Sequence, residues 1–335
     1  MKLRPTQATA PTRIDLAGGT LDIWPISHLI EDAVTVNLAV QLTAHAIVTP
    51  RRDRRLEIRS VDRDRTVLHE LPLAVSAFRG PLSWLVRLVV AFAPGIPLTL
   101  TCQAEAPAGA GLGGSSALGI AVGAALAGAT GERLSKDALL RRVMNLETRE
   151  IGVPTGNQDY LAALWGGLAG YQHRLDGVAR QPLPHAAELS SRLVLAYTGQ
   201  PRQSGFSNWD MFRRYVEKDA ATKRRMETIA RLARSMRDAL LAGDLDETGR
   251  LLGEEGRLRY SLAPSVATDA LRAADGAARR AGALGAKVCG AGGGGCMVAF
   301  AREGRRDDVA EAIARTGATL LRVRVARRGV SVSEP

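Results

Sequence analysis

The sequence has few aromatic residues and few cysteines. Aromatic residues make up 4% of its 335 residues, so a core must be built mainly from Ala, Val, Leu and Ile. The three cysteines, Cys102, Cys289 and Cys296, are odd in number and form no C-x-x-C pair, which argues against a disulfide framework and a paired thiol site. We expect buried thiols in a reducing compartment.

Long apolar segments are also missing. The longest weakly polar run, Ala117–Ala129, is too short to cross a bilayer. Residues 1–12 lack the charged-then-apolar pattern of a signal peptide. The sequence therefore predicts a cytoplasmic protein with no membrane partner, and it leaves open whether the chain is a monomer or a homodimer.

The formal net charge of +11 would suit either nucleic acid or an anionic small molecule. The arginines are spread through helical stretches such as 213–237 and 302–315, usually near Glu or Asp. No basic tract alternates with aromatic residues, and no zinc-ligand spacing is present. We predict solvated helix faces, no nucleic-acid partner, and a field that favours ATP or a sugar phosphate.

Hydrophobic periodicity divides the chain into two predicted domains, residues 1–185 and 186–335. Strands are predicted at 33–49, 56–60, 66–68, 98–105, 287–289, 296–301 and 319–325, with further strands and a turn within 168–197. Helices are predicted at 83–92, 117–129, 135–151, 160–165 and 306–315, and 208–281 is helical with few interruptions. Ser135 is a plausible N-cap for its helix.

Glycines concentrate in the segment Pro107–Ser116, which a strand enters and a helix leaves. Backbone N–H groups at the helix N-terminus would face this loop, and glycines leave them open to a phosphate. The predicted phosphate contacts are Pro107, Gly109, Gly111, Leu112, Gly113, Gly114, Ser115 and Ser116. The two serine hydroxyls also suit Mg²⁺.

Other interpretations of this loop stay open. Gly109, Gly111 and Gly114 satisfy the dinucleotide pattern G-x-G-x-x-G, but so does Gly290–Gly295, which shows how weak the pattern is alone. A dinucleotide fold also begins at such a loop, whereas about a hundred mostly strand-like residues come first here. A tight strand–helix turn is the remaining alternative. No Gly-Lys-Ser/Thr follows, so the loop is not a Walker A motif.

Two acidic residues between the Gly-rich segments are candidates for chemistry. Glu147 continues the apolar stripe of Leu140, Val143 and Met144, where a carboxylate needs a partner. That partner is either an arginine or a metal ion, since Mg²⁺ prefers carboxylate oxygens. Asp159 lies twelve residues further on, near the start of a short helix, where it could act in catalysis or simply cap the helix.

Three segments together resemble the motifs of the GHMP kinases, a family that includes galactokinase, homoserine kinase and mevalonate kinase. The segment 11–22, Pro-Thr-Arg-Ile-Asp-Leu-Ala-Gly-Gly-Thr-Leu-Asp, is similar to the first motif. Residues 107–116 resemble the central phosphate-binding motif, and residues 287–296 resemble the third. The resemblance spans most of the chain. It implies an α+β fold with a ribosomal protein S5 domain 2-like N-terminal domain and a ferredoxin-like C-terminal domain.

The resemblance also implies roles for particular residues. ATP phosphates would lie on residues 109–116, and Ser115 or Ser116 with Glu147 would hold Mg²⁺. Asp159 would face the acceptor hydroxyl as the catalytic residue. The substrate side would hold Arg13, Asp22 and Gly156, and the third motif would contribute Gly290, Gly292, Gly293 and Gly294. Many family members carry Ser where Gly114 stands, so the Mg²⁺-binding serine is not fixed.

The acceptor is expected to be a sugar or sugar phosphate. Residues 197–204 are similar to a Thr-Gly-x-x-Arg-x-Ser stretch of heptose 7-phosphate kinases, in which Arg202 could bind a substrate phosphate or be a surface arginine. Residues 157–160 also look closer to that group than to mevalonate kinase, whereas the first motif, with Leu21, Ile23 and Trp24, departs from its pattern. A heptose 7-phosphate kinase-like enzyme is therefore expected ahead of a fucokinase- or galactokinase-like one. Trp24 is expected in the core rather than stacked on a sugar. A mevalonate-pathway kinase, a non-catalytic sugar and ATP sensor, and a dinucleotide-dependent oxidoreductase are the alternatives.

Overall fold

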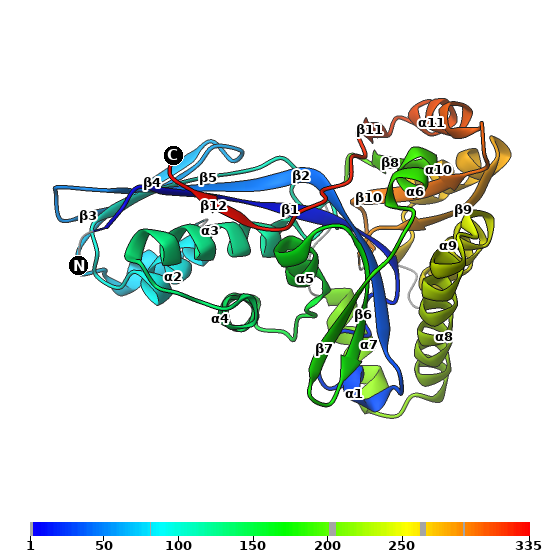
Figure 1. Cartoon of the computed structure of the whole chain (residues 1–335), viewed down its shortest axis with the longest axis horizontal. Coiled ribbons are helices and arrows are strands. Elements are labelled where there is room, and N and C mark those ends of the chain that lie inside the picture. The colour runs from blue at the N-terminus through cyan, green and yellow to red at the C-terminus, as the bar shows by residue number, and fades with distance from the viewer. Residues whose placement is uncertain (1–2, 81, 201–205, 262–265, 291) are drawn as a thin grey trace.

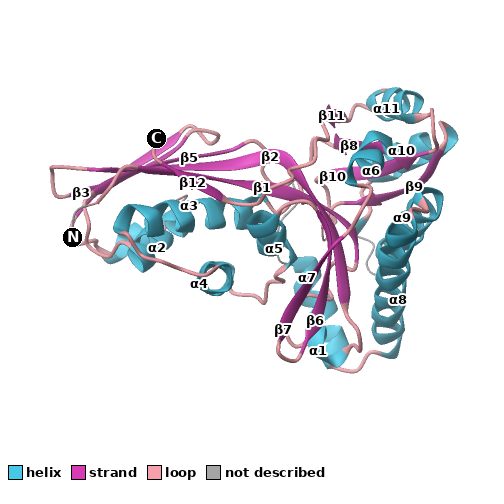
Figure 2. Ribbon diagram, in the orientation of Figure 1, coloured by secondary structure: helices cyan, strands magenta, loops and turns pink. Residues whose placement is uncertain are grey.

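Two β-sheets organise the chain, one with eight strands and one with four (Figure 1). The computed structural model describes residues 3–80, 82–200, 206–261, 266–290 and 292–335. The larger sheet and the helices beneath it form the elongated part of the molecule, and the smaller sheet lies at the other end, beside two long helices (Figure 2).

The larger sheet has the strand order β12-β1-β2-β5-β3-β4, and β6 pairs with both β2 and β7. Its strands are β1 (Thr6–Ala17), β2 (Val34–Pro50), β3 (Arg55–Ser60), β4 (Arg65–Glu70), β5 (Leu98–Ala104), β6 (Leu168–Arg174), β7 (Gly177–Pro182) and β12 (Ser331–Ser333). Most pairs are antiparallel, and β3 with β5 is parallel. The segment 11–22 therefore begins on β1, which lies between the edge strand β12 and the long strand β2.

Helices cover one face of this sheet (Figure 2). They are α2 (Ser83–Phe92), α3 (Gly114–Thr130), α4 (Lys136–Ile151) and α5 (Gln158–Trp165), with a short 3-10 turn at Val75–Phe78 before them. Small side chains let α3 pack closely, because a Cβ on Gly119 would lie only 2.6 Å from Val143 Cγ1 of α4. Ser135 caps α4 as predicted, with its hydroxyl accepting from the N–H of Ala138 at 3.1 Å.

The smaller sheet is antiparallel and has the order β11-β8-β10-β9. Its strands are β8 (Leu193–Tyr197), β9 (Ala283–Val288), β10 (Cys296–Ala301) and β11 (Thr319–Leu321). The remaining helices are α1 (Ile26–Leu29), α6 (Ala186–Arg192), α7 (Phe206–Val216), α8 (Ala220–Ala242), α9 (Leu245–Tyr260), α10 (Asp269–Arg280) and α11 (Arg306–Ala314). Helix α9 packs against β9 and also contacts β1, so it joins the two ends of the molecule.

Most of the predicted elements are confirmed, and several details are wrong. Residues 186–192 form a helix inside a region predicted as strands, β9 begins at Ala283 rather than Lys287, and β11 ends at Leu321. Trp24 is 72% exposed, so its expected place in the core is wrong. The division at residues 185 and 186 stays a prediction; the last strand, β12, returns to pair with β1.

Candidate active site

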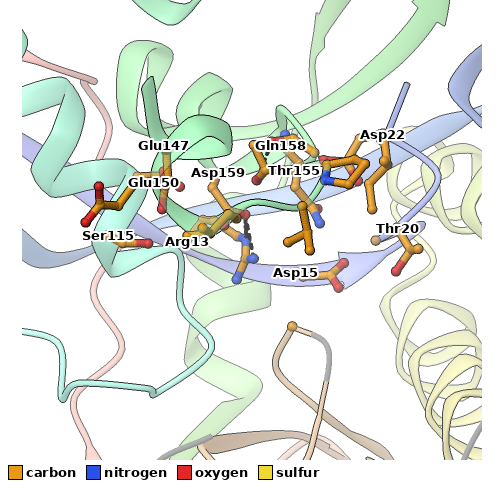
Figure 3. Close-up of a pocket in the computed structure, with 18 of the residues that line it drawn as sticks. Arg13, Asp15, Thr20, Asp22, Ser115, Glu147, Glu150, Thr155, Gln158 and Asp159 are labelled. Atoms are coloured by element: carbon orange, nitrogen blue, oxygen red, sulfur yellow. Dashed lines mark hydrogen bonds and ion pairs between the residues drawn. The ribbon is translucent and has the colours of Figure 1, made fainter. Parts of the chain in front are cut away.

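A cavity of about 270 Å³ lies where the three motif segments 11–22, 107–116 and 287–296 approach one another. Its lining combines acidic, hydroxyl and arginine side chains, and Figure 3 shows many of them pointing toward one another. The lining includes Arg13, Asp15, Gly19, Thr20, Asp22, Ser115, Ser116, Glu147, Glu150, Gly156, Gln158, Asp159, Arg259 and Gly290.

The central Gly-rich segment makes the predicted turn from β5 into α3. Gly109, Gly111 and Gly113 have φ of 69°, 78° and 72°, in the left-handed region that only glycine adopts readily. The N–H of Arg13 donates to the carbonyl of Leu112 at 3.0 Å, which fixes this loop against β1. The free N–H groups at the start of α3 can therefore face a phosphate, as the sequence predicts.

The third Gly-rich segment packs directly on the central one. The N–H of Cys296 donates to the carbonyl of Ala110 at 2.8 Å. A Cβ on Gly111 would lie 2.3 Å from the carbonyl oxygen of Cys289, so a side chain there would push the two loops apart. Of the predicted third-motif residues, Gly290 lines the cavity, whereas Gly292, Gly293 and Gly294 are not among its lining residues. All four have positive φ.

Glu147 of α4 is buried, with 7% exposure. Its carboxylate accepts hydrogen bonds from hydroxyl groups rather than pairing with an arginine. The Ser116 hydroxyl donates to its Oε2 at 3.1 Å, and the Tyr160 hydroxyl makes a short bond to the same oxygen. Burial raises the pKa of the Glu147 carboxyl above its usual value, although the hydroxyls of Tyr160 and Ser115 oppose this. A bound cation would stabilise the charged form of such a carboxylate.

The two candidate serines differ in their surroundings. Ser116 is buried and engaged with Glu147, whereas Ser115, the second residue of α3, is exposed at the cavity. Among the described residues no group of three or more His, Cys, Asp and Glu side chains is arranged to hold a metal ion. One carboxylate and one hydroxyl fit Mg²⁺ that is completed by substrate phosphates and water, which is how this ion is usually bound.

Asp159 in the first turn of α5 pairs with Arg13 across the cavity (Figure 3). The Nε of Arg13 donates to Asp159 Oδ1 at 2.8 Å, and Nη1 donates to the carbonyl of Gly111 at 2.7 Å. Burial by itself lowers the pKa of the Arg13 guanidinium, but the charge of Asp159 holds it above its usual value. Arg13 thus connects the predicted catalytic residue to the central Gly-rich segment, in addition to its predicted substrate role.

Asp22 and Gly156 are neighbours, as their joint assignment to the substrate side predicts. Asp22 is buried, and its Oδ2 accepts from the N–H of Gln158 at 2.9 Å. A Cβ on Gly156 would lie 2.0 Å from the same oxygen. The loop before α5 can therefore approach the carboxylate only because residue 156 has no side chain.

Replacing Gly156 with Ala is expected to displace the Asp22 carboxylate. The backbone of Gly156 has no positive φ, so the fold should tolerate Ala, and the side-chain end of Asp22 would move instead. We expect the acceptor KM to rise roughly tenfold, as for loss of a hydrogen bond to a charged group, with little change in the KM for ATP. Steady-state kinetics would test this against Gly276→Ala in α10, far from the cavity; equal KM values in the two variants would contradict it.

Burial of the Asp22 carboxyl should also make the stability of the protein depend on pH. Burial raises the pKa of its carboxyl to about 6, although the N–H of Gln158 opposes the shift. The folded protein therefore binds more protons than the unfolded chain between about pH 4 and pH 6, so this group's contribution to stability is full below about pH 4 and is lost as the pH rises through 6.

The Asp22→Asn variant should lack this contribution. We expect the free energy of unfolding of the variant minus that of the unmodified protein to increase by about 3 kcal/mol from pH 4 to pH 7. Urea denaturation at a series of pH values measures this difference. A difference that is constant with pH would contradict the raised pKa.

A second group of charged residues, which was not predicted from the sequence, lies beside the cavity. Asp15, Glu255, Arg259 and Lys287 form an ionic network whose side chains are at most 3% exposed. Burial tends to raise the pKa of the Asp15 carboxyl, but the charges of Lys287, Arg259 and Arg13 hold it below its usual value. Asp15 and Lys287 lie within the motif segments 11–22 and 287–296, which was the only sign in the sequence that they belong to the site. Nothing in the sequence pointed to Glu255 or Arg259.

Two further expectations concern Arg202 and the membrane. Arg202 lies outside the described residues, so its substrate role stays a prediction. None of the helices in the described part of the chain is long and apolar enough to cross a membrane.

Known proteins are similar to this chain in both sequence and fold. The family model described as GHMP kinases N terminal domain matches residues 83–167, and GHMP kinases C terminal matches residues 236–319. Mevalonate kinase of Pyrococcus horikoshii is 33% identical over 244 residues, covering 72% of this chain and 69% of that protein. D-glycero-alpha-D-manno-heptose 7-phosphate kinase of Campylobacter jejuni is 26% identical over 316 residues, covering 89% and 90%.

Solved structures agree with these matches. A D-glycero-D-manno-heptose 1-phosphate kinase of Bacteroides thetaiotaomicron superimposes with a TM-score of 0.76 at 23% identity, covering 98% of this chain and 99% of that one. The mevalonate kinase of Methanococcus jannaschii also gives 0.76, at 15% identity, covering 95% and 98%. The chain belongs to the GHMP kinase family. It is a small-molecule kinase with this family's fold, and ATP is the phosphate donor of the family.

Proposed function

We propose that this kinase transfers the γ-phosphoryl group of ATP to a hydroxyl of a sugar or sugar phosphate, with Mg²⁺ as the cofactor. The observation that carries the proposal is the placement of Asp159 and Arg13 between the phosphate loop and the Asp22 side of one cavity. A γ-phosphate over the start of α3 and a hydroxyl beside Asp22 would then meet at Asp159.

The transfer needs positioning and charge neutralisation more than covalent help from the protein. The acceptor oxygen forms a bond to the γ-phosphorus, and the bond from that phosphorus to the β,γ-bridging oxygen breaks, leaving ADP. Asp159 accepts the hydroxyl proton or stabilises it, and Arg13 holds Asp159 against the loop carbonyl of Gly111. Glu147 with Ser115 or Ser116 would hold Mg²⁺, which supplies positive charge to the phosphates; Ser115 is the more accessible of the two.

The charges that line the cavity favour a polyhydroxyl acceptor. Among the described lining residues, the cations Arg13 and Arg259 are both paired with carboxylates. The acidic lining residues Asp15, Asp22, Glu147, Glu150 and Asp159 outnumber them. Hydroxyl groups can donate to such a lining, whereas the carboxylate of mevalonate would need a cation that is not already paired.

Within this class we favour an acceptor like that of the heptose 7-phosphate kinases. The relative from Campylobacter jejuni matches nearly the whole chain, which supports this choice. A phosphate on the acceptor would require a further cation, for which Arg202 is our candidate. The higher identity to mevalonate kinase keeps mevalonate as the second candidate, and a sugar and ATP sensor without turnover is the third.

An ATP-consumption screen separates these candidates. The purified protein would be assayed with Mg²⁺ and ATP against free hexoses and heptoses, their phosphates, and mevalonate, with ADP formation as the readout. We expect the highest kcat/KM for a sugar or sugar phosphate. Mevalonate as the best acceptor would overturn the substrate class, and binding of ATP without turnover of any acceptor would favour the sensor.

A further inference from the structure

The buried ionic network joins three distant segments of the chain. Lys287 of β9 contacts Glu255 of α9 and lies 3.3 Å from Asp15 Oδ2 of β1. Arg259, one turn beyond Glu255 on α9, lies with Nη2 at 3.1 Å from Glu255 Oε1 and 3.8 Å from Asp15 Oδ2. The two carboxylates and two cations balance in charge, so each ion is buried with counter-charges of the opposite sign.

Two members of the network also bind the backbone of the loop that follows β1. Glu255 Oε1 accepts from the N–H of Gly18 at 3.0 Å, and Arg259 Nη2 donates to the carbonyl of Gly19 at 2.6 Å. This loop then passes through Thr20, whose φ of 78° is unusual for a β-branched residue, and reaches Asp22. Its conformation therefore depends on contacts supplied by α9.

Gly19 shows how closely the network and the loop fit together. A Cβ on Gly19 would lie 2.5 Å from Asp15 Oδ2 and 2.8 Å from Arg259 Nη2. Its φ is not positive, so the missing side chain provides room for the network rather than an unusual backbone conformation. Gly19, Arg259 and Asp15 all line the cavity next to Thr20 and Asp22, as Figure 3 shows for the three labelled residues Asp15, Thr20 and Asp22.

We propose that Glu255 and Arg259 are positioning residues that hold the loop 18–22 from α9, so that Asp22 is presented correctly to the acceptor. Among the described residues, the hydrogen bonds and ion pairs of Glu255 and Arg259 go to Asp15, Gly18, Gly19, Lys287 and each other, and none goes to residues 107–116. The network therefore sets the acceptor side of the cavity and leaves the nucleotide side unchanged. The assignment of the acceptor to Asp22 rests on the function proposed above.

The test compares Arg259→Lys with Arg250→Lys, the same substitution on the same helix. Arg250 pairs with Glu247 and Glu254 on the exposed face of α9. Lys keeps the charge at residue 259 but loses the guanidinium fork that reaches Gly19. We expect the KM for the best acceptor of the screen to rise roughly tenfold in Arg259→Lys, with the KM for ATP unchanged. Arg250→Lys should change neither value.

Hydrogen–deuterium exchange provides a readout that needs no acceptor. We expect the peptide covering residues 16–23 to exchange faster in Arg259→Lys than in Arg250→Lys, with exchange in α3 unchanged. Gly19→Ala is the second variant, because it separates the loop from the network without changing any charge. It should give the same exchange and kinetic pattern if Arg259→Lys does not fold.

Several outcomes would overturn the proposal. Unchanged hydrogen–deuterium exchange of the peptide 16–23 in Arg259→Lys and in Gly19→Ala would show that the network does not hold the loop. Faster exchange with an unchanged acceptor KM, or equal increases in both KM values, would show a structural role only. A failure of the proposed function would be seen separately, because the unmodified protein would then phosphorylate none of the acceptors. The exchange experiment would still decide whether Arg259 holds the loop.

Discussion

Replacing Asp159 with Asn is expected to reduce kcat by roughly 10²- to 10⁴-fold, the usual effect of removing a positioned proton acceptor. Asn keeps the size of the side chain and can still accept a hydrogen bond from Arg13, but it cannot take up a proton from the acceptor hydroxyl. ATP binding should be preserved, because the phosphate loop keeps its own contacts with β1 and the third motif. Single-turnover kinetics and a fluorescent-nucleotide titration measure the two quantities.

Asp137→Asn is the matched control, because Asp137 lies in the first turn of α4 as Asp159 lies in the first turn of α5. Both substitutions remove an acid that complements a helix dipole, but Asp137 is exposed and does not line the cavity. Asp137→Asn should retain its activity. Similar losses in both variants, or near-normal turnover of Asp159→Asn, would contradict the catalytic assignment.

The second large effect is expected on stability. Lys287→Met should lower the free energy of unfolding by about 3–5 kcal/mol, as is typical when one partner of a buried ion pair is removed. The substitution leaves Asp15 and Glu255 buried with Arg259 as the remaining cation of the network. Met fills a similar volume, so the loss reports charge rather than packing. Urea denaturation at neutral pH measures this change.

The double variant Glu255→Gln with Lys287→Met separates charge imbalance from packing. It removes one charge of each sign and leaves Asp15 with Arg259, and Gln can still accept from the N–H of Gly18. Replacing buried charges in balance is often neutral for stability. We therefore expect the double variant to be more stable than Lys287→Met alone. A double variant that is less stable than Lys287→Met would contradict this expectation and show that the Glu255 charge stabilises the fold through Arg259 and the N–H of Gly18 even without Lys287.

The local features of the fold could be predicted because they depend on neighbouring residues. The alternation of apolar and polar residues in β5, the small residues of α3 and the serine cap of α4 each act within a few positions. Helix α6 could not be separated from the strands around it, because seven residues carry too little periodicity. Trp24 was expected in the core rather than stacked on a sugar, yet it is exposed, two residues beyond the first motif.

The sequence by itself determined the family, the Gly-rich turn before α3 and the acidic candidates Glu147 and Asp159, since motif spacing and a carboxylate on an apolar stripe are visible along the chain. Only the tertiary structure decided their partners. Asp159 and Arg13 are 146 positions apart, and Arg259 reaches Gly19 across 240. The charge of a side chain does not specify which distant charge it will meet; that is decided when α9 and β9 pack beside β1. Pairing with Arg13 and the neighbouring loop carbonyl showed that Asp159 faces the cavity instead of capping its helix.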